Sequence, residues 1–259
     1  MAGRSAPGAS LVARAFEILG AFDERHRSLA LAELAERTGL PTSTALRIAR
    51  QLVADGALAR RPDGRYVVGR RIWDLGLLAP VESDLRETAS PYLHDLHAAT
   101  RATVHLAVRE GAEVLYLDRL AGRASVPVVS RVGTRLPLHA TGVGKVLLAH
   151  APDDVVAAVL GDLRRLTPHT ITQPRVLTGQ LARVRRDGYA TTAEEMTLGA
   201  CSAAVPIRAG GEGEVVAALG VVVPSLRRDR VRLVAALEVA AAGIGRRLRH
   251  PGGPAAPRR

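Results

Sequence analysis

The stretch from residue 42 to residue 51 carries side chains of the types that bind nucleic acids. Its polar members are Thr42, Ser43, Thr44, Arg47, Arg50 and Gln51. Hydroxyl groups can bond phosphate oxygens, and arginine and glutamine side chains can reach the edges of bases in a major groove. These residue types at this spacing indicate a DNA-binding surface.

Two short helices are expected to position these side chains. Within residues 31–55, apolar residues recur at helical spacing on both sides of a break at residues 38–41. Gly39 stands where a helix ends in a left-handed residue, and Pro41 suits the first turn of the next helix. The pattern predicts a helix-turn-helix. The alternative is an ordinary helical hairpin whose polar face is solvated.

A β-hairpin is expected directly after the second helix. Residues 58–69 contain two short apolar runs on either side of Asp63-Gly64, a pair typical of tight hairpin turns. Arg60, Arg61 and Arg65 surround that turn, where they could contact the phosphate backbone or an adjacent groove. A basic hairpin in this position favours a winged helix-turn-helix.

The charge balance also favours a polyanionic partner. The formal net charge is +11, and residues 41–71 hold seven arginines against two aspartates, a local excess of +5. Lys145 is the only lysine beside 35 arginines (36 minus 1), which we attribute to codon usage. No apolar run approaches the ~20 residues of a membrane span, and the N-terminus lacks the apolar core of a secretion signal. With a single cysteine, Cys201, the chain suits a reducing compartment, so we expect a cytoplasmic protein.

Three further helices are expected in the first hundred residues. An amphipathic helix begins after Ser10 and should pack on the helix-turn-helix. Residues 72–79 form an apolar helix that contains the only Trp, and residues 83–100 form another. We interpret residues 70–100 as a helical linker. The apolar surface of residues 72–79 exceeds what a lone helix tolerates, which indicates a dimer or tetramer.

From residue 102 the pattern changes to that of a sheet. Val104, Leu106 and Val108 alternate with other residues, as in a half-buried strand. Further strands are expected at residues 114–117, 125–132, 189–193, 200–208 and 215–223, and helices at residues 142–150, 152–160, 174–187 and 227–248. Because strands and helices do not alternate strictly, we predict an α+β fold with helices packed on a sheet.

One helix start in this second half could bind an anion. If Thr141 caps a helix, the amides of Gly142 and Val143 face outward at its positive end and can bind a carboxylate. The alternative is an ordinary capped helix with glycines for close packing. A phosphate-binding loop ending at Lys145 is excluded, because the required glycine and hydroxyl are absent at their positions.

The remaining reactive residues favour structural roles. Cys201 has no evident His and acid partners, and His94 and His97 are more typical of a helix surface than of a metal site. Glu194 and Glu195 are adjacent and would face opposite sides of a strand. The sequence therefore predicts no catalytic residue, no metal and no cofactor.

Three blocks of sequence, in the same order and at matching intervals, resemble the IclR family of bacterial transcription regulators. They are LAELAERTGLPTSTALR with the hairpin GRYVVG, then LPLHATGVGKVLLA, then GYATTAEEMTLGACSAAVPI with VAALGVVVP. The resemblance implies a winged helix-turn-helix domain (10–69), a helical linker (70–100) and a GAF-like α/β effector-binding domain (101–249), between disordered ends (1–9 and 250–259). It also implies a homodimer or homotetramer on double-stranded operator DNA.

The resemblance also implies an effector pocket. Matching positions give Val128, Leu136, Gly142, Val143, Thr192, Ser202, Gly220 and Val222. Thr192 stands where familiar members have an acid, and Gly220 and Val222 stand where they have two serines. We therefore expect Gly220 to make space and the pocket to hold few polar groups, which suits a carboxylate with an aromatic or aliphatic body.

The recognition helix departs from the family at one position. Leu46 stands just before Arg47, where relatives often carry a polar residue or a histidine. Leucine offers only apolar contact, for example to a thymine methyl group, so we expect a different operator sequence.

These observations predict a ligand-responsive DNA-binding regulator, acting as a repressor on an operator with dyad symmetry. One rival is a small-molecule enzyme with a helical N-terminal appendage, against which the basic hairpin counts. A second rival is a nucleoid-type binder without a ligand, against which the whole second domain counts.

Overall fold

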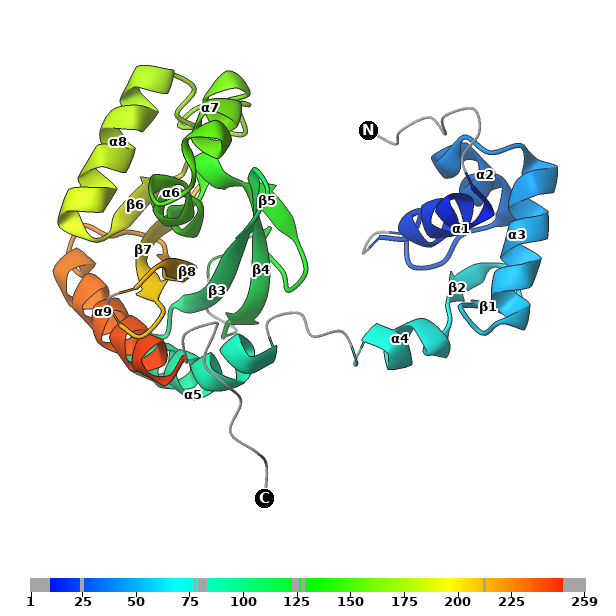
Figure 1. The fold of residues 1–259 in the computed structure, drawn as a ribbon, viewed down its shortest axis with the longest axis horizontal. Helices are drawn as coiled ribbons and strands as arrows, with labels where there is room; N and C mark the ends of the chain where they lie inside the picture. The colour runs from blue at the N-terminus through cyan, green and yellow to red at the C-terminus, as the bar shows by residue number, and fades with distance from the viewer. Residues whose placement is uncertain are drawn as a thin grey trace. The chain divides into compact units, whose positions relative to one another are not determined.

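The structure, a computed structural model, describes residues 10–23, 26–76, 78, 83–122, 126, 129–211 and 213–248. The chain divides into two compact units, residues 1–81 and 82–259 (Figure 1), which we describe separately. None of the described helices is long and apolar enough to cross a bilayer.

The first unit packs helices against a small hairpin. Its elements in chain order are α1 (Leu11–Gly20), α2 (Leu31–Thr38), α3 (Thr42–Ala54), β1 (Leu58–Arg60), β2 (Tyr66–Val68) and α4 (Arg70–Gly76). Ile18, Leu34 and Ile48, one from each of the first three helices, share a core with Leu58 and Tyr66 of the hairpin. The burial of these side chains joins the helix-turn-helix and the wing into one domain.

The turn and cap residues have the predicted roles. Gly39 ends α2 with φ of +68°, a conformation that glycine adopts without steric cost. The Ser10 hydroxyl accepts a hydrogen bond from the Ala13 amide at 3.1 Å and caps α1. The predicted helix-turn-helix is confirmed.

The second unit is an antiparallel sheet with helices on both faces. Its strands are β3 (Thr103–Glu110), β4 (Glu113–Leu120), β5 (Arg135–Pro137), β6 (Ala190–Ala193), β7 (Cys201–Arg208) and β8 (Val215–Val223), in the spatial order β5-β4-β3-β8-β7-β6. Its helices are α5 (Ser83–Thr100), α6 (Gly142–Ala149), α7 (Asp153–Gly161), α8 (Pro174–Asp187) and α9 (Arg230–Arg247). The predicted α+β class is confirmed.

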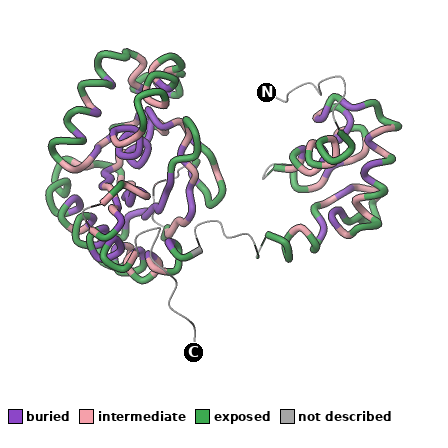
Figure 2. The backbone as a smooth tube through the Cα atoms, in the orientation of Figure 1, coloured by how far each residue is buried: buried purple, intermediate pink, exposed green. Residues whose placement is uncertain are grey.

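Strand alternation assigns each face of the sheet to its own helices. Val104, Leu106 and Val108 of β3 pack with α5 and α9, whereas Ala107 packs with α6 and α8. Figure 2 shows buried backbone running through the strands and through α6, with exposed turns on the outer helices. His105 is two residues before Ala107 in β3, so its side chain points to the same face of the sheet. This is the face covered by α6, where the cavity described below is found.

Two expectations about this unit need correction. No strand forms at the described residues of 125–132, which are 126 and 129–132; the short strand β5 lies further on, at Arg135–Pro137. Residues 83–100 were expected as part of a linker, but Leu85, Leu93 and Leu96 of α5 belong to the core of the second unit. The predicted disordered ends lie outside the described residues.

Candidate functional site

The outer face of α3 gathers most of the residues predicted to contact DNA. Thr42, Ser43, Arg47, Arg50 and Gln51 are exposed, whereas Thr44 and Leu46 are half-buried. Ser43, Leu46, Arg47, Arg50 and Gln51 line one shallow hollow. The opposite face buries Ala45, Ile48 and Ala49, so packing fixes which side of α3 is presented to a partner.

The arginines of the hairpin have different roles. Arg61 is exposed, and the guanidinium of Arg60 lies 5.8 Å from the centre of the Tyr66 ring. Arg65 instead turns back to α2, where Nη2 donates to the Ser28 carbonyl oxygen and to Glu33 Oε2, both at 2.7 Å. Arg65 therefore holds the wing onto the helices, and only the other two remain suited to phosphate contact.

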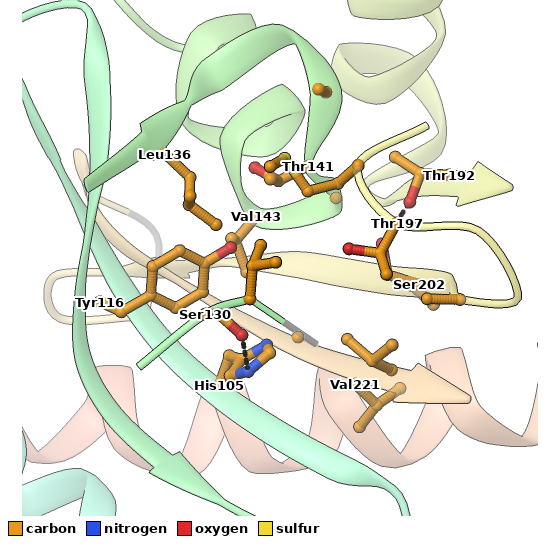
Figure 3. A pocket seen from close by; sticks show the side chains of 18 residues that line it. His105, Tyr116, Ser130, Leu136, Thr141, Val143, Thr192, Thr197, Ser202 and Val221 are labelled. Atoms are coloured by element: carbon orange, nitrogen blue, oxygen red, sulfur yellow. Dashed lines mark hydrogen bonds between the residues drawn. The ribbon is translucent and has the colours of Figure 1, made fainter. Parts of the chain in front are cut away.

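In the second unit, a cavity lies between the sheet and the start of α6 (Figure 3). Of the residues matched to the family pocket, it is lined by Leu136, Gly142, Val143, Thr192, Ser202, Gly220 and Val222. The eighth, Val128, lies outside the described residues.

The start of α6 presents two amides at this cavity. The Thr141 hydroxyl accepts a hydrogen bond from the Gly144 amide at 3.0 Å, and the Thr141 carbonyl accepts one from the Lys145 amide. The amides of Gly142 and Val143 have no acceptor within the helix, because they belong to its first turn. Together with the positive end of the helix dipole, they form a place for a carboxylate.

Two hydroxyls stand beside these amides. Thr192 of β6 and Ser202 of β7 are cross-strand partners, and their side-chain oxygens lie 2.6 Å apart. A Cβ on Gly142 would come within 2.5 Å of the Ser202 hydroxyl, so only glycine permits this approach of helix and strand. One hydroxyl of this pair donates to the other, and the proton that remains can be donated to an anion held by the amides.

Gly220 lies where the sheet meets α6. A Cβ at this position would come within 2.8 Å of Val143 Cγ1, so glycine gives α6 room to dock on the sheet. Gly220 also lines the cavity, and its expected role of making space there stays a prediction. The expectation of few polar groups needs correction, because five further polar residues line the cavity. They are His105, Tyr116, Ser130, Thr141 and Thr197.

The buried polar groups on β3 and β4 are neutral. Burial, and secondarily the charge of Arg119, lowers the pKa of His105 to about 3. Burial raises the pKa of Tyr116 above its ordinary value, although a hydrogen bond with Thr141 opposes the rise. The imidazole and the phenol therefore bring hydrogen-bonding groups to the cavity without bringing charge.

Behind the cavity wall lies a buried ion pair. Lys145 Nζ is 2.6 Å and 2.7 Å from the two carboxylate oxygens of Glu195, and the Lys145 side chain is 1% exposed. Burial lowers the pKa of the lysine and raises that of the glutamate, and the attraction between the two opposes both shifts. Glu195 directly precedes Met196 and Thr197, which line the cavity, so the pair anchors this part of the wall to α6.

The sequence predicted the capped helix start at Gly142 but not the polar groups opposite it. His105 lies in a strand whose alternating pattern the sequence shows. Because adjacent residues of a strand point to opposite faces, the apolar Leu106 next to it could have placed His105 on the other face, which is the face of the cavity. Lys145 is the only lysine of the sequence, and this could have indicated a specific partner, although we attributed it to codon usage. His94 and His97 donate hydrogen bonds to the carbonyl oxygens of Ser90 and Ala102.

Comparison with known proteins agrees with both halves of this architecture. Residues 11–62 match the IclR helix-turn-helix domain model, and residues 79–246 match the model of the bacterial transcriptional regulator IclR C-terminal domain. The chain belongs to the IclR family.

Members of the IclR family with known names resemble the chain along most of its length. XynR, a transcriptional regulator of Escherichia coli, is 31% identical over 93% of this chain and 97% of its own. TtgV of Pseudomonas putida is 34% identical over 76% of each chain. An IclR homolog from Microbacterium hydrocarbonoxydans, crystallised with 4-hydroxybenzoate, is 37% identical and superposes with a TM-score of 0.87 over 92% of this chain and 99% of its own. The chain is thus a DNA-binding transcriptional regulator of a family whose C-terminal domain binds ligands, and not an enzyme.

Proposed function

We propose that this regulator is a repressor that binds a small ring carboxylate at the start of α6 and releases a dyad operator in response. The proposal rests on the cavity at the start of α6. The amides of Gly142 and Val143 lie there beside the hydroxyls of Thr192 and Ser202. Two backbone amides, the free hydroxyl proton of the Thr192–Ser202 pair and the positive helix end favour a carboxylate over a neutral ligand. The 4-hydroxybenzoate bound to the Microbacterium homolog supports the same class of effector for this chain.

The DNA-binding half of the proposal is supported by the first unit. We propose that Thr42, Ser43, Thr44, Leu46, Arg47, Arg50 and Gln51 enter the major groove, and that Arg60 and Arg61 contact phosphates. Since Arg65 is bonded to Glu33, we remove it from the predicted contact set.

We further propose a homodimer as the DNA-binding form. Exposed apolar side chains lie on α1 (Leu11, Val12 and Phe16) and on α4 (Trp73 and Leu75). Several large apolar side chains exposed on two helices are typical of a protein–protein interface. A two-fold dimer places two recognition helices on successive half-sites, which is the reason to expect a dyad operator.

The effector would act through differential affinity. A ligand shifts an equilibrium only by the difference in its affinity for the two states. We propose that the carboxylate binds the arrangement of subunits that fits DNA less well.

The proposal is tested by a mobility-shift assay on the DNA that flanks the coding region. We expect one retarded complex on a dyad sequence, weakened by benzoate or 4-hydroxybenzoate and unaffected by their methyl esters.

Two variants test the DNA interface. Arg47→Ala should weaken specific binding by about 1–3 kcal/mol, whereas Arg61→Ala should weaken binding to all DNA sequences alike and reduce its salt dependence. Arg175→Ala, which removes an exposed arginine from α8, is the matched control and should change neither. Unchanged binding in both Arg47→Ala and Arg61→Ala would contradict the proposed interface, and tighter DNA binding with the acid would contradict the proposed release of the operator.

A further inference from the structure

We propose that Ser130 and His105 form a second subsite in the cavity that recognises a hydroxyl group, so that the effector is a ring carboxylate with a hydroxyl at the end remote from its carboxylate. This inference rests on the proposed function and specifies the ligand class that the same cavity would take.

The two residues form a buried hydrogen-bonded pair away from the hydroxyls near the α6 start. His105 Nε2 lies 2.8 Å from Ser130 Oγ, and each residue is 3% exposed. Figure 3 shows the pair on the side of the cavity away from Thr192 and Ser202, and the apolar side chains of Leu136 and Val143 also line the cavity. A ligand that spans the cavity would therefore meet polar groups at both ends and apolar side chains along its length.

The imidazole is held in a fixed orientation. The rings of His105 and Tyr116 meet edge to face, with centroids 5.0 Å apart and planes at 76°. Tyr116 is itself held, because its hydroxyl is hydrogen-bonded to Thr141, the cap of α6. A side chain fixed in this way loses little freedom when a ligand binds.

The chemistry of the pair selects a hydroxyl group. If Nε2 carries its proton, it donates to Ser130 Oγ, and the serine proton remains free to be donated to the ligand. If Nε2 is unprotonated, the serine donates to it and can accept a hydrogen bond from the ligand. A ligand hydroxyl both donates and accepts, so it suits either arrangement.

A carboxylate does not suit this subsite. Burial keeps the imidazole neutral at ordinary pH, since the pKa of His105 is about 3. The pair then offers at most one donor and no positive charge, which cannot replace the hydration of an anion. The carboxylate is therefore directed to the amides of Gly142 and Val143, and the hydroxyl to Ser130.

Titration calorimetry with benzoate, 4-fluorobenzoate and 4-hydroxybenzoate tests the subsite on the full-length protein. Fluorine fills nearly the space of a hydroxyl but donates no hydrogen bond. We expect the wild type to bind 4-hydroxybenzoate about tenfold more tightly than the other two. In Ser130→Ala this ratio should fall to about one, with the affinity for benzoate retained.

Thr192→Val is the matched control, because it changes a hydroxyl at the carboxylate end. It should weaken benzoate and 4-hydroxybenzoate by the same factor and leave their ratio at about ten. Ser130→Thr, which keeps the hydroxyl, should also keep the ratio, and thermal unfolding of each variant monitors folding. If Ser130→Ala does not fold, the wild-type affinities for 4-hydroxybenzoate, 4-fluorobenzoate and benzoate decide whether the protein recognises the hydroxyl.

The outcomes separate this inference from the function on which it rests. Equal wild-type affinities for benzoate and 4-hydroxybenzoate would overturn the subsite and leave the carboxylate effector standing. A ratio that persists in Ser130→Ala, or tighter binding of 3-hydroxybenzoate than of 4-hydroxybenzoate, would overturn the placement of the hydroxyl. No binding of any of these acids would overturn the ring carboxylate effector and, with it, the subsite.

Discussion

Replacement of Lys145 by methionine would show how strongly the buried ion pair holds the cavity wall. Methionine has a similar length but no charge, so Glu195 would remain buried without its partner. Removing one member of a buried pair costs about 3–5 kcal/mol, because the remaining charge is neither hydrated nor compensated. At 2–4 °C per kcal/mol for a domain of this size, the Tm of the second unit should fall by roughly 6–20 °C.

Thermal unfolding at pH 8 and pH 5 would identify the cause. In Lys145→Met, Glu195 loses the charge that lowers its pKa, so burial raises the folded-state pKa further above the ordinary value of 4.5. The folded state then binds more protons than the unfolded state, and stability is lost as the pH rises through the folded-state pKa. The deficit relative to wild type should therefore be smaller at pH 5 than at pH 8.

A double variant gives the control. Lys145→Met combined with Glu195→Leu leaves no charge to bury, and it should recover most of the stability that the single variant loses. A deficit below about 1 kcal/mol in Lys145→Met, or a double variant as unstable as the single one, would refute the reasoning.

Three other predictions concern stability and assembly. The pKa of His105 is about 3 in the folded protein and near 6.5 in the unfolded chain, so the free energy of unfolding should fall below pH 6.5 by up to about 1.4 kcal/mol per pH unit. Urea unfolding of His105→Gln at several pH values should show a smaller loss of stability on acidification. Gly144→Ala would bring a Cβ within 2.3 Å of the Leu138 carbonyl oxygen and should cost about 1–3 kcal/mol in thermal unfolding, whereas Gly179→Ala, with open space around it, should be neutral or stabilising. Phe16→Ser combined with Trp73→Ser should shift sedimentation at micromolar concentration toward the monomer, and a wild-type monomer would contradict the proposed dimer.

The sequence predicted most where local chemistry determines structure. Gly39 and Pro41 located the turn of the helix-turn-helix, and the bounds of α5, α8 and β8 were predicted to the residue. The α6 start was predicted as well, because a capping threonine and the following glycines are local signals.

The sequence predicted least where tertiary contacts decide. The engagement of Arg65 depends on Glu33, 32 residues away in the chain, and the pairing of Lys145 depends on Glu195, 50 residues away. The roles of Gly220 and His105 likewise depend on which side chain faces them across the sheet and helix layers. Single-sequence periodicity contains no information about such distant pairs.

Helix α6 has a consequence for how this chain can evolve. All eight of its residues are buried, whereas in the fourteen residues of α8 only Leu177, Leu181 and Val184 are. A helix surrounded on every side has no position at which a substitution is met by solvent, and its neighbours are close-packed. Random mutagenesis should therefore return very few accepted replacements between Gly142 and Ala149 and many along α8. New ligand preferences in this chain are thus expected to arise from changes in the strands and loops that face α6, while the helix that receives the carboxylate stays the same.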